Sequence, residues 1–310
     1  MKRAIMTIPQ ISFEEGEAAL DWHGVIAALK EGHTLPKAEI GDTFLYRDPD
    51  TLLSRSAFID GLGIAVKSAT VFPKNPDNGK PMINGAVSLF SDEDGTLQAL
   101  IDFHLVTKWK TAGDSLLAAS RLAREDSKTI LIVGAGTVGR SLREAYGAYF
   151  PDASFTVWNR TRSAAEAMAQ DDPRMDVADT LQDAIEAADI ISCATMSTEP
   201  LIKGEWLRAG QHIDLIGAYR PDMREADDEA MLRARIFVDS YETTLGHIGE
   251  VKIPLETGII GRRDIVADYY DMAAFKRTSN DEITLFKNGG GAHLDLMTSK
   301  FILDRWHVSP

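Results

Sequence analysis

The spacing of apolar residues divides the first part of the chain into helical and extended segments. Between Glu14 and Glu31 apolar residues recur at helical intervals, at Ala18, Leu20, Val25, Ile26 and Leu29. From Thr43 to Asp102 the pattern is that of short strands, and the last two form a predicted hairpin around the turn SDEDG. Helical spacing returns from His104 to Arg124. This part of the chain therefore predicts a mixed α+β unit.

From Lys128 onward apolar strands alternate with helical segments. The strands read KTILIVGAG, SFTVWN, ADIISCAT, QHIDLIG and RIFVD. Such alternation predicts an α/β fold with a doubly wound parallel sheet of the Rossmann type. Near the C-terminus the glycine run NGGGA opens a last predicted helix, which we expect to pack back on the first unit.

Composition and charge narrow the class of protein. The 310 residues are enough for two domains with separate cores, and 44% of them are hydrophobic. A net charge of -14 disfavours nucleic acid as a partner, because a phosphate backbone requires a basic surface. The single cysteine, Cys193, the lack of a signal-peptide pattern and the lack of any run near the roughly 18 apolar residues of a membrane span predict a cytoplasmic protein without a membrane partner.

The stretch GAGTVG at residues 134–139 follows a predicted strand and opens a predicted helix. Gly134 permits a tight turn, Gly136 lets a pyrophosphate approach the backbone, and Gly139 allows the helix to pack closely on the strand. The N–H groups at the start of the helix, at Thr137 and Val138, face such an anion. We predict that these five residues bind a dinucleotide.

The end of the next strand bears on the choice of coenzyme. A carboxylate expected there would bind the adenosine ribose and repel a 2′-phosphate, but the chain has Asn159 and Arg160 instead. Arg160 and Arg162 either attract a 2′-phosphate, which makes NADP(H) possible, or are solvated surface residues. We also predict cofactor contacts at two later strand ends, where Gly217 and Ala218 are small to let the nicotinamide pass: Ala194, Thr195, Met196, Ile216, Gly217, Ala218 and Tyr219.

Several stretches together resemble the ornithine cyclodeaminase/mu-crystallin family over nearly the whole chain. They are GIAVKSATVFPKNP, AVSLFSDEDGTLQALID, LVTKWKTAG, VGAGTVGR, VWNRT, IGAYRPDMRE and VDSYETTLGHIGE. The resemblance implies hydride transfer between a nicotinamide and the carbon of an α-imino acid, with NAD(H) favoured. It also implies a homodimer, a substrate-binding and dimerisation domain of residues 1–115 and 291–310, and a dinucleotide-binding Rossmann domain of residues 116–290.

The resemblance assigns cationic residues to a substrate carboxylate. The catalytic lysine of the family falls on Lys67, which would bind the carboxylate and the imine nitrogen; the alternative is a lysine that extends to the surface. Lys37 aligns with a carboxylate-binding arginine. Lys110 replaces a second arginine that contacts carboxylate or cofactor, and it keeps the charge but loses the bidentate geometry.

Departures from the family pattern bear on the substrate. Arg55 suggests a second substrate carboxylate, unless strand alternation directs its side chain to the opposite face. Asn288 and Gly289 replace a bulkier stretch and offer space and N–H donors for an anion. Tyr219 stands where cyclodeaminases carry an aspartate, and a tyrosine is a poor general base at neutral pH. Cyclodeaminase activity is therefore disfavoured.

The leading hypothesis from the sequence is an NAD(P)H-dependent reductase that converts iminosuccinate to L-aspartate. The alternatives are a cyclic ketimine reductase acting on a pyrroline or piperideine carboxylate, an alanine dehydrogenase, and a non-enzymatic protein that binds NAD(P)H. No spacing typical of a metal site is present.

Overall fold

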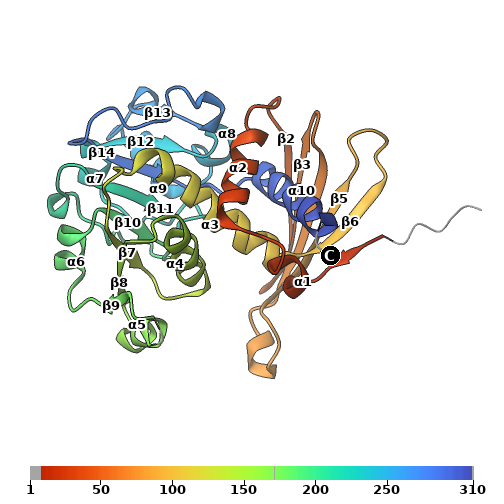
Figure 1. Cartoon of the computed structure of the whole chain (residues 1–310), viewed down its shortest axis with the longest axis horizontal. Helices are drawn as coiled ribbons and strands as arrows, with labels where there is room; N and C mark the ends of the chain where they lie inside the picture. Colours follow the sequence, from red (N-terminus) through yellow and green to blue (C-terminus); the bar gives the residue numbers. More distant parts are fainter. Residues whose placement is uncertain (1–7, 171, 309–310) are drawn as a thin grey trace, which may run out of the picture. The chain divides into compact units, whose positions relative to one another are not determined.

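The computed structural model describes residues 8–170 and 172–308, and the chain forms two compact units (Figure 1). The first unit comprises Met1–Lys110 and Ala292–Pro310, and the second comprises Thr111–Gly291. The boundaries expected from the sequence lay at residues 115/116 and 290/291. The observed boundaries are at Lys110/Thr111, inside one helix, and at Gly291/Ala292.

The first unit is built on a six-stranded sheet with the order β1-β6-β5-β4-β3-β2. All neighbouring strands are antiparallel except β1 and β6. The elements of this unit are β1 (Gln10–Ile11), α1 (Phe13–Glu17), α2 (Trp22–Gly32), β2 (Glu39–Arg47), β3 (Asp50–Ile59), β4 (Gly63–Val71), the 3-10 helix η1 (Asn75–Asn78), β5 (Ile83–Phe90), β6 (Leu97–Asp102), the first part of α3 (Phe103–Leu122), and α10 (Ala292–Val308).

One face of this sheet is covered by α10, which packs against β3, β4 and β5 and against α2 (Figure 1). On β4 every second residue from Gly63 to Ala69 is buried, as expected for a strand with one covered face. The small side chains of Ala65 and Ala69 leave room for the helix. Lys67 lies between them on the same face, so its ammonium group is directed into the covered side of the sheet.

The N-terminal helical segment is two helices, whereas the sequence predicts a single one. Ser12 caps α1, and its hydroxyl forms a capping box with Glu15. Asp21 caps α2 by accepting a hydrogen bond from the Gly24 N–H at 2.7 Å. The apolar spacing continues across the break at residues 18–21, but the cap at Asp21 fixes a new helix start, which periodicity alone does not detect.

The second unit contains an eight-stranded, fully parallel sheet with the order β13-β12-β14-β11-β10-β7-β8-β9. Its elements are β7 (Thr129–Val133), α4 (Thr137–Tyr149), β8 (Ser154–Trp158), α5 (Arg162–Ala169), β9 (Met175–Val177), α6 (Leu181–Ala187), β10 (Ile190–Cys193), η2 (Gly204–Trp206), β11 (His212–Leu215), α7 (Asp228–Arg233), β12 (Ala234–Val238), α8 (Tyr241–Thr244), α9 (Gly249–Glu256), η3 (Arg262–Asp264), β13 (Ile265–Ala267), η4 (Tyr269–Asp271) and β14 (Ile283–Lys287). The predicted doubly wound α/β class is confirmed.

Strand β14 is absent from the sequence prediction, although it lies between β11 and β12 in the middle of the sheet. All five of its residues are buried. A short apolar run of this kind resembles the start of a buried helix as much as a strand, and the glycines that follow it favour the opening of the last helix.

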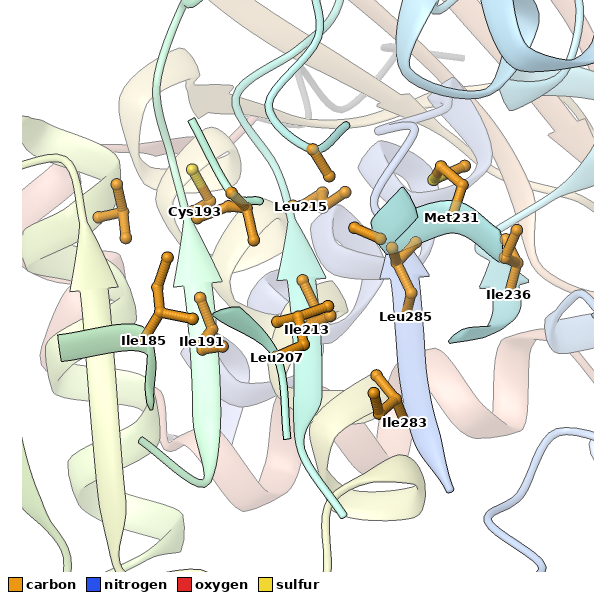
Figure 2. Packing of buried hydrophobic residues seen from close by; sticks show 14 of the residues in the cluster. Ile185, Ile191, Cys193, Leu207, Ile213, Leu215, Met231, Ile236, Ile283 and Leu285 are labelled. Atoms are coloured by element: carbon orange, nitrogen blue, oxygen red, sulfur yellow. The ribbon is translucent and has the colours of Figure 1, made fainter. Parts of the chain in front are cut away.

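Apolar side chains from neighbouring strands pack into one core on a face of this sheet (Figure 2). Ile191, Ile213 and Leu285 come from β10, β11 and β14, and each is fully buried. The strands are in register, so the last residues of β7, β10, β11 and β14 lie side by side. The loops that follow these four strands therefore start along the same edge of the sheet, which is where ligands bind in such folds.

Candidate functional site

Lys67 is the centre of a buried polar cluster in the first unit. Its side chain is only 7% exposed, and its Nζ donates hydrogen bonds to Asp295 Oδ1 and to Thr107 Oγ1, both at 2.9 Å. The same ammonium lies 4.5 Å from the centre of the Phe103 ring. The alternative of an extended surface lysine is therefore wrong, because a lysine is buried in this way only when it is paired.

The electrostatic surroundings of Lys67 bring its pKa near the physiological range. The pKa falls from 10.5 to about 8, first because burial disfavours the charged form and then because Lys110 and Arg55 repel it, while Asp295 opposes the fall. Burial raises the pKa of Asp295, but the charges of Lys67, Lys110 and Arg55 outweigh it and hold that pKa below its usual value. An ammonium in this setting is protonated at neutral pH and still able to release a proton.

Two further buried residues, Lys110 and His293, belong to the cluster. Lys110 is buried on α3 and lies three positions after Thr107, so both side chains are on the same face of the helix. His293 is fully buried on α10, and its pKa is lowered to about 3 by burial and then by Lys110. The His293 ring is therefore neutral at physiological pH and adds no charge.

Arg55 lies on β3 directly opposite Lys67 on β4, so the two side chains extend from the same face of the sheet. This placement settles the question that strand alternation left open. Asp42 is directly opposite Arg55 on β2, and its Oδ2 accepts from Arg55 Nε at 3.0 Å and from Nη2 at 2.9 Å. The guanidinium is thus already bound by a carboxylate of the protein.

Five charged side chains of the cluster affect which anion can bind beside them. Lys67, Lys110 and Arg55 are cations, whereas Asp295 and Asp42 are carboxylates. Cations thus outnumber carboxylates among these five side chains, which suits a bound anion. These five residues come from five separate elements: β2, β3, β4, α3 and α10.

Three predicted substrate residues lie elsewhere or have other partners. Lys37 is exposed in the segment that precedes β2. In the second unit, Asn288 Nδ2 donates to Thr111 O and Ser115 Oγ, both at 3.1 Å. A Cβ atom on Gly289 would lie 2.2 Å from Thr244 Oγ1 and 2.7 Å from Asp239 Oδ1. Gly289 therefore makes room for a buried Asp239–Thr244 pair, and the space for a ligand expected beside it is filled.

The glycine motif in the second unit has the geometry expected from the sequence. Gly134 has a positive φ of 112°, which favours glycine in the turn after β7. A Cβ on Gly139 would lie 2.0 Å from Gly134 O, whereas a Cβ on Gly136 would meet no atom within 4 Å. Gly136 is the N-cap of α4 and provides no side-chain cap, so the N–H groups of the first helical turn face an open space. These features fit a pyrophosphate.

The end of β8 borders a pocket of about 150 Å³ next to that loop. Asn159 Oδ1 accepts from Ala135 N at 3.1 Å, so Asn159 braces the glycine motif itself. Arg162 is paired with Glu166 and Asp179 at 2.9 and 3.0 Å, which neutralises the charge expected to attract a 2′-phosphate. Arg160 is exposed at the rim of the pocket.

The reason expected for the small residue Gly217 is wrong. A Cβ at this position would lie 1.8 Å from Thr195 O, so the missing side chain permits contact between two loops of the protein rather than clearance for a nicotinamide. Ala218 is fully buried and Ile216 nearly so, whereas Met196 and Tyr219 are 73% and 59% exposed. Ala194 and Thr195 lie at the end of β10, beside this second loop.

Asp295, Thr107 and Asp42 were not predicted from the sequence. A signal for Asp295 exists, since it is an acid between Leu294 and Leu296 in an apolar helix, and a buried carboxylate requires a cation or donors. The sequence does not reveal which cation, because Lys67 lies 228 positions away. Among the residues that the structure describes, no group of three or more His, Cys, Asp or Glu side chains is arranged to hold a metal ion.

The model of the ornithine cyclodeaminase/mu-crystallin family matches residues 58–309. The chain belongs to this family. A curated family relative, the Delta(1)-pyrroline-2-carboxylate reductase of Paracoccus denitrificans, is 49% identical over 300 residues, which cover 94% of this chain and 95% of that protein. The family resemblance expected from the sequence is therefore confirmed.

Two solved structures illustrate the range of the family fold. The Delta(1)-pyrroline-2-carboxylate reductase of Thermococcus litoralis in complex with NADH and L-proline is 27% identical, with a TM-score of 0.88 and coverage of 96% of this chain and 97% of that one. The iminosuccinate reductase of Paracoccus denitrificans in complex with NAD⁺ is 21% identical, with a TM-score of 0.85 over 96% of each chain. At 21% identity the likeness shows the fold alone. No helix in the described part of the chain has the length and apolar character needed to cross a bilayer.

Proposed function

We propose that this protein is an NADH-dependent reductase of cyclic α-imino acids, with Delta(1)-pyrroline-2-carboxylate as the preferred substrate and L-proline as the product. The observation that carries the proposal is the buried Lys67 ammonium, which Asp295 and Thr107 hold in place, whereas the nearby Arg55 is already bound by Asp42. This arrangement suits a substrate with one carboxylate. The 49% identical relative is named for this reaction, and the Thermococcus litoralis structure contains NADH with L-proline.

The roles of the residues follow from their charges. Lys67 and Lys110 bind the substrate carboxylate and thereby orient the imine carbon. NADH, when bound, would supply the hydride to that carbon, and the imine nitrogen would then need a proton. Lys67 holds that proton at its Nζ, since its pKa of about 8 allows it to be charged at neutral pH and to donate. Asp295 and Thr107 fix the position of Nζ.

The coenzyme proposal rests on the second unit. Gly134, Gly136 and Gly139 form a cradle that fits a pyrophosphate. Beside the pocket at the end of β8, Asp179 neutralises Arg162 and places a negative charge where NADPH would carry its 2′-phosphate. Arg160 remains as an exposed cation. We therefore expect NADH to be preferred, with NADPH used at lower affinity.

A steady-state comparison of substrates tests the proposal. NADH or NADPH oxidation is measured with Delta(1)-pyrroline-2-carboxylate, with the piperideine homologue, and with oxaloacetate or pyruvate plus ammonia. We expect kcat/KM for a cyclic imino acid to exceed that for the acyclic ones by about tenfold or more, the range that a few pocket contacts provide. A faster reaction with oxaloacetate and ammonia would support iminosuccinate, and tight coenzyme binding without turnover of any substrate would support a binding protein.

Iminosuccinate stays the second candidate because Arg55 shares a face with Lys67. A second carboxylate would have to displace Asp42 from Arg55, which makes that substrate less favourable. Arg55→Ala is therefore expected to change KM for the cyclic substrate by less than about threefold, the size of a partly exposed ion pair. A KM for iminosuccinate that rises much more in the same variant would show that Arg55 binds a second carboxylate.

Asp295→Asn is expected to move the basic limb of the pH profile of kcat/KM to lower pH. The protonated Lys67 is the active form, so activity is present below its pKa of about 8 and is lost as pH rises through that value. Asp295 raises the pKa of Lys67, and without its charge burial, Lys110 and Arg55 lower that pKa further. Asp304→Asn, an exposed change on the same helix, is the control. A limb that does not move would exclude Lys67 as the titrating group.

We also propose a homodimer in which β2 contributes to the contact between copies. β2 is the edge strand of its sheet, and Phe44, Leu45 and Tyr46 on it are 47%, 60% and 77% exposed. Adjacent exposed apolar side chains on an edge strand are typical of an association surface. A monomeric mass in analytical ultracentrifugation at micromolar concentration would contradict this proposal.

A further inference from the structure

The carboxylate of Glu225 joins two loops at the edge of the parallel sheet. Its Oε1 accepts from Thr195 N at 2.7 Å and from Thr195 Oγ1 at 3.0 Å. Its Oε2 accepts from Gly217 N at 2.7 Å and from Ala218 N at 3.2 Å. Thr195 follows β10 and Gly217 follows β11, which are neighbouring strands. One fully buried side chain thus fixes both strand ends.

The close approach of these loops is the reason for the glycine at position 217. A side chain there would overlap the backbone of Thr195, with a Cβ 1.8 Å from Thr195 O and 2.3 Å from Thr195 N. The Glu225 carboxylate holds Gly217 against Thr195 by bonding to N–H groups of both residues. Gly217 and Glu225 therefore both contribute to the close contact between the loops after β10 and β11.

A second acid fixes the main chain of Glu225. Glu250, on α9, accepts from Glu225 N at 2.6 Å and from Ala226 N at 3.0 Å. Burial and then the charge of Glu225 raise the pKa of Glu250 to about 7, and the charge of the buried Lys287 opposes this rise. Two buried carboxylates are tolerated here because Glu225 has four donors and Glu250 takes up a proton near neutral pH.

We infer that Glu225 is a positioning residue for the nicotinamide half of the dinucleotide: it sets the loops after β10 and β11 in the arrangement that the nicotinamide and its ribose contact. This inference rests on the proposed function, since it assumes a nicotinamide dinucleotide. The pyrophosphate would lie at the neighbouring loop after β7, because β7 and β10 end in register. The loop after β10 also borders Gly134, where a Cβ would lie 2.7 Å from Ala194 O. Glu225 itself bonds to Thr195, Gly217 and Ala218, so we expect its larger effect on the nicotinamide half.

The test compares Glu225→Gln with the wild-type chain by calorimetric titration of NADH and of ADP-ribose, which lacks the nicotinamide. Glutamine keeps the shape of the side chain, but its NH₂ group faces N–H donors and cannot accept their hydrogen bonds. We expect the Kd of NADH to rise by about tenfold or more and the Kd of ADP-ribose to change by less than about threefold. Glu225→Asp, which keeps the charge, should recover part of the NADH affinity.

Asp189→Asn is the matched control for damage to a buried carboxylate. Asp189 accepts from Lys128 N and Thr129 N at 2.9 and 3.1 Å, and it joins β7 to β10 at the opposite, amino ends of the strands. This variant should lower the melting temperature without changing either Kd. Equal weakening of NADH and ADP-ribose in Glu225→Gln, or no weakening of either, would overturn the inference.

The two proposals can fail separately in this experiment. If NADH binding shows the expected split but no imino acid is reduced, the positioning role of Glu225 stands and the proposed reaction is wrong. If imino acid reduction is observed and Glu225→Gln leaves the KM of NADH unchanged, the reaction stands and the positioning role is wrong. If the wild-type chain does not bind NADH, both are wrong.

Discussion

Replacing Lys67 by methionine is expected to lower kcat for the cyclic imino acid by about 10²- to 10⁴-fold, the usual contribution of a positioned proton donor. The methionine side chain has a similar length but cannot bind the carboxylate or hold a proton at the imine nitrogen. NADH affinity should stay within about threefold of the wild-type value, because the glycine cradle lies in the other unit. Steady-state kinetics and a fluorescence titration with NADH measure the two effects.

Lys67→Met is also expected to lower the free energy of unfolding, and a double variant separates this effect from the loss of activity. Lys67→Met leaves the carboxylate of Asp295 buried without its cation, and the loss of one partner of a buried pair costs about 3–5 kcal/mol. Replacing both partners by apolar residues is often close to neutral. The double variant Lys67→Met/Asp295→Leu should therefore recover much of the free energy of unfolding without recovering activity. Activity that returns together with stability would show that Lys67 has only a structural role.

The glycine motif allows two alanine substitutions with opposite expected results. In Gly139→Ala the new Cβ would lie 2.0 Å from the backbone oxygen of Gly134, which cannot move as a flexible side chain can. We expect a loss of about 1–3 kcal/mol in the free energy of unfolding, as for other overpacked sites. Chemical denaturation measures this change.

In Gly136→Ala the new Cβ meets no atom of the protein within 4 Å, and the backbone angles of φ -82° and ψ -171° are open to alanine. The variant should fold normally and bind NADH about tenfold more weakly, which is about 1.4 kcal/mol, because the methyl group occupies the path of the pyrophosphate. Wild-type affinity for NADH in this variant would show that the pyrophosphate lies elsewhere.

Local patterns in the sequence predicted the features that depend on neighbouring residues. The strand–glycine–helix order of residues 129–149 is one, since Gly134 and Gly139 are required by the turn and by the packing of one helix on its own strand. The hairpin of β5 and β6 is another, set by a turn between two apolar runs. The break between α1 and α2 was missed because the capping hydrogen bond of Asp21 competes with an apolar spacing that continues across it.

The sequence alone determined the family and the parallel sheet, and it predicted cations for an acidic substrate, because strand alternation, glycine spacing and motifs are properties of adjacent residues. Tertiary structure decided the partners of those cations. The ion pairs Lys67–Asp295 and Arg55–Asp42 form only when the strands pair and α10 packs on the sheet. The tertiary structure also decided that the missing side chain of Gly217 permits a close contact with Thr195. Charge compensation and close packing depend on distances in space, and these distances arise between residues that are far apart along the chain.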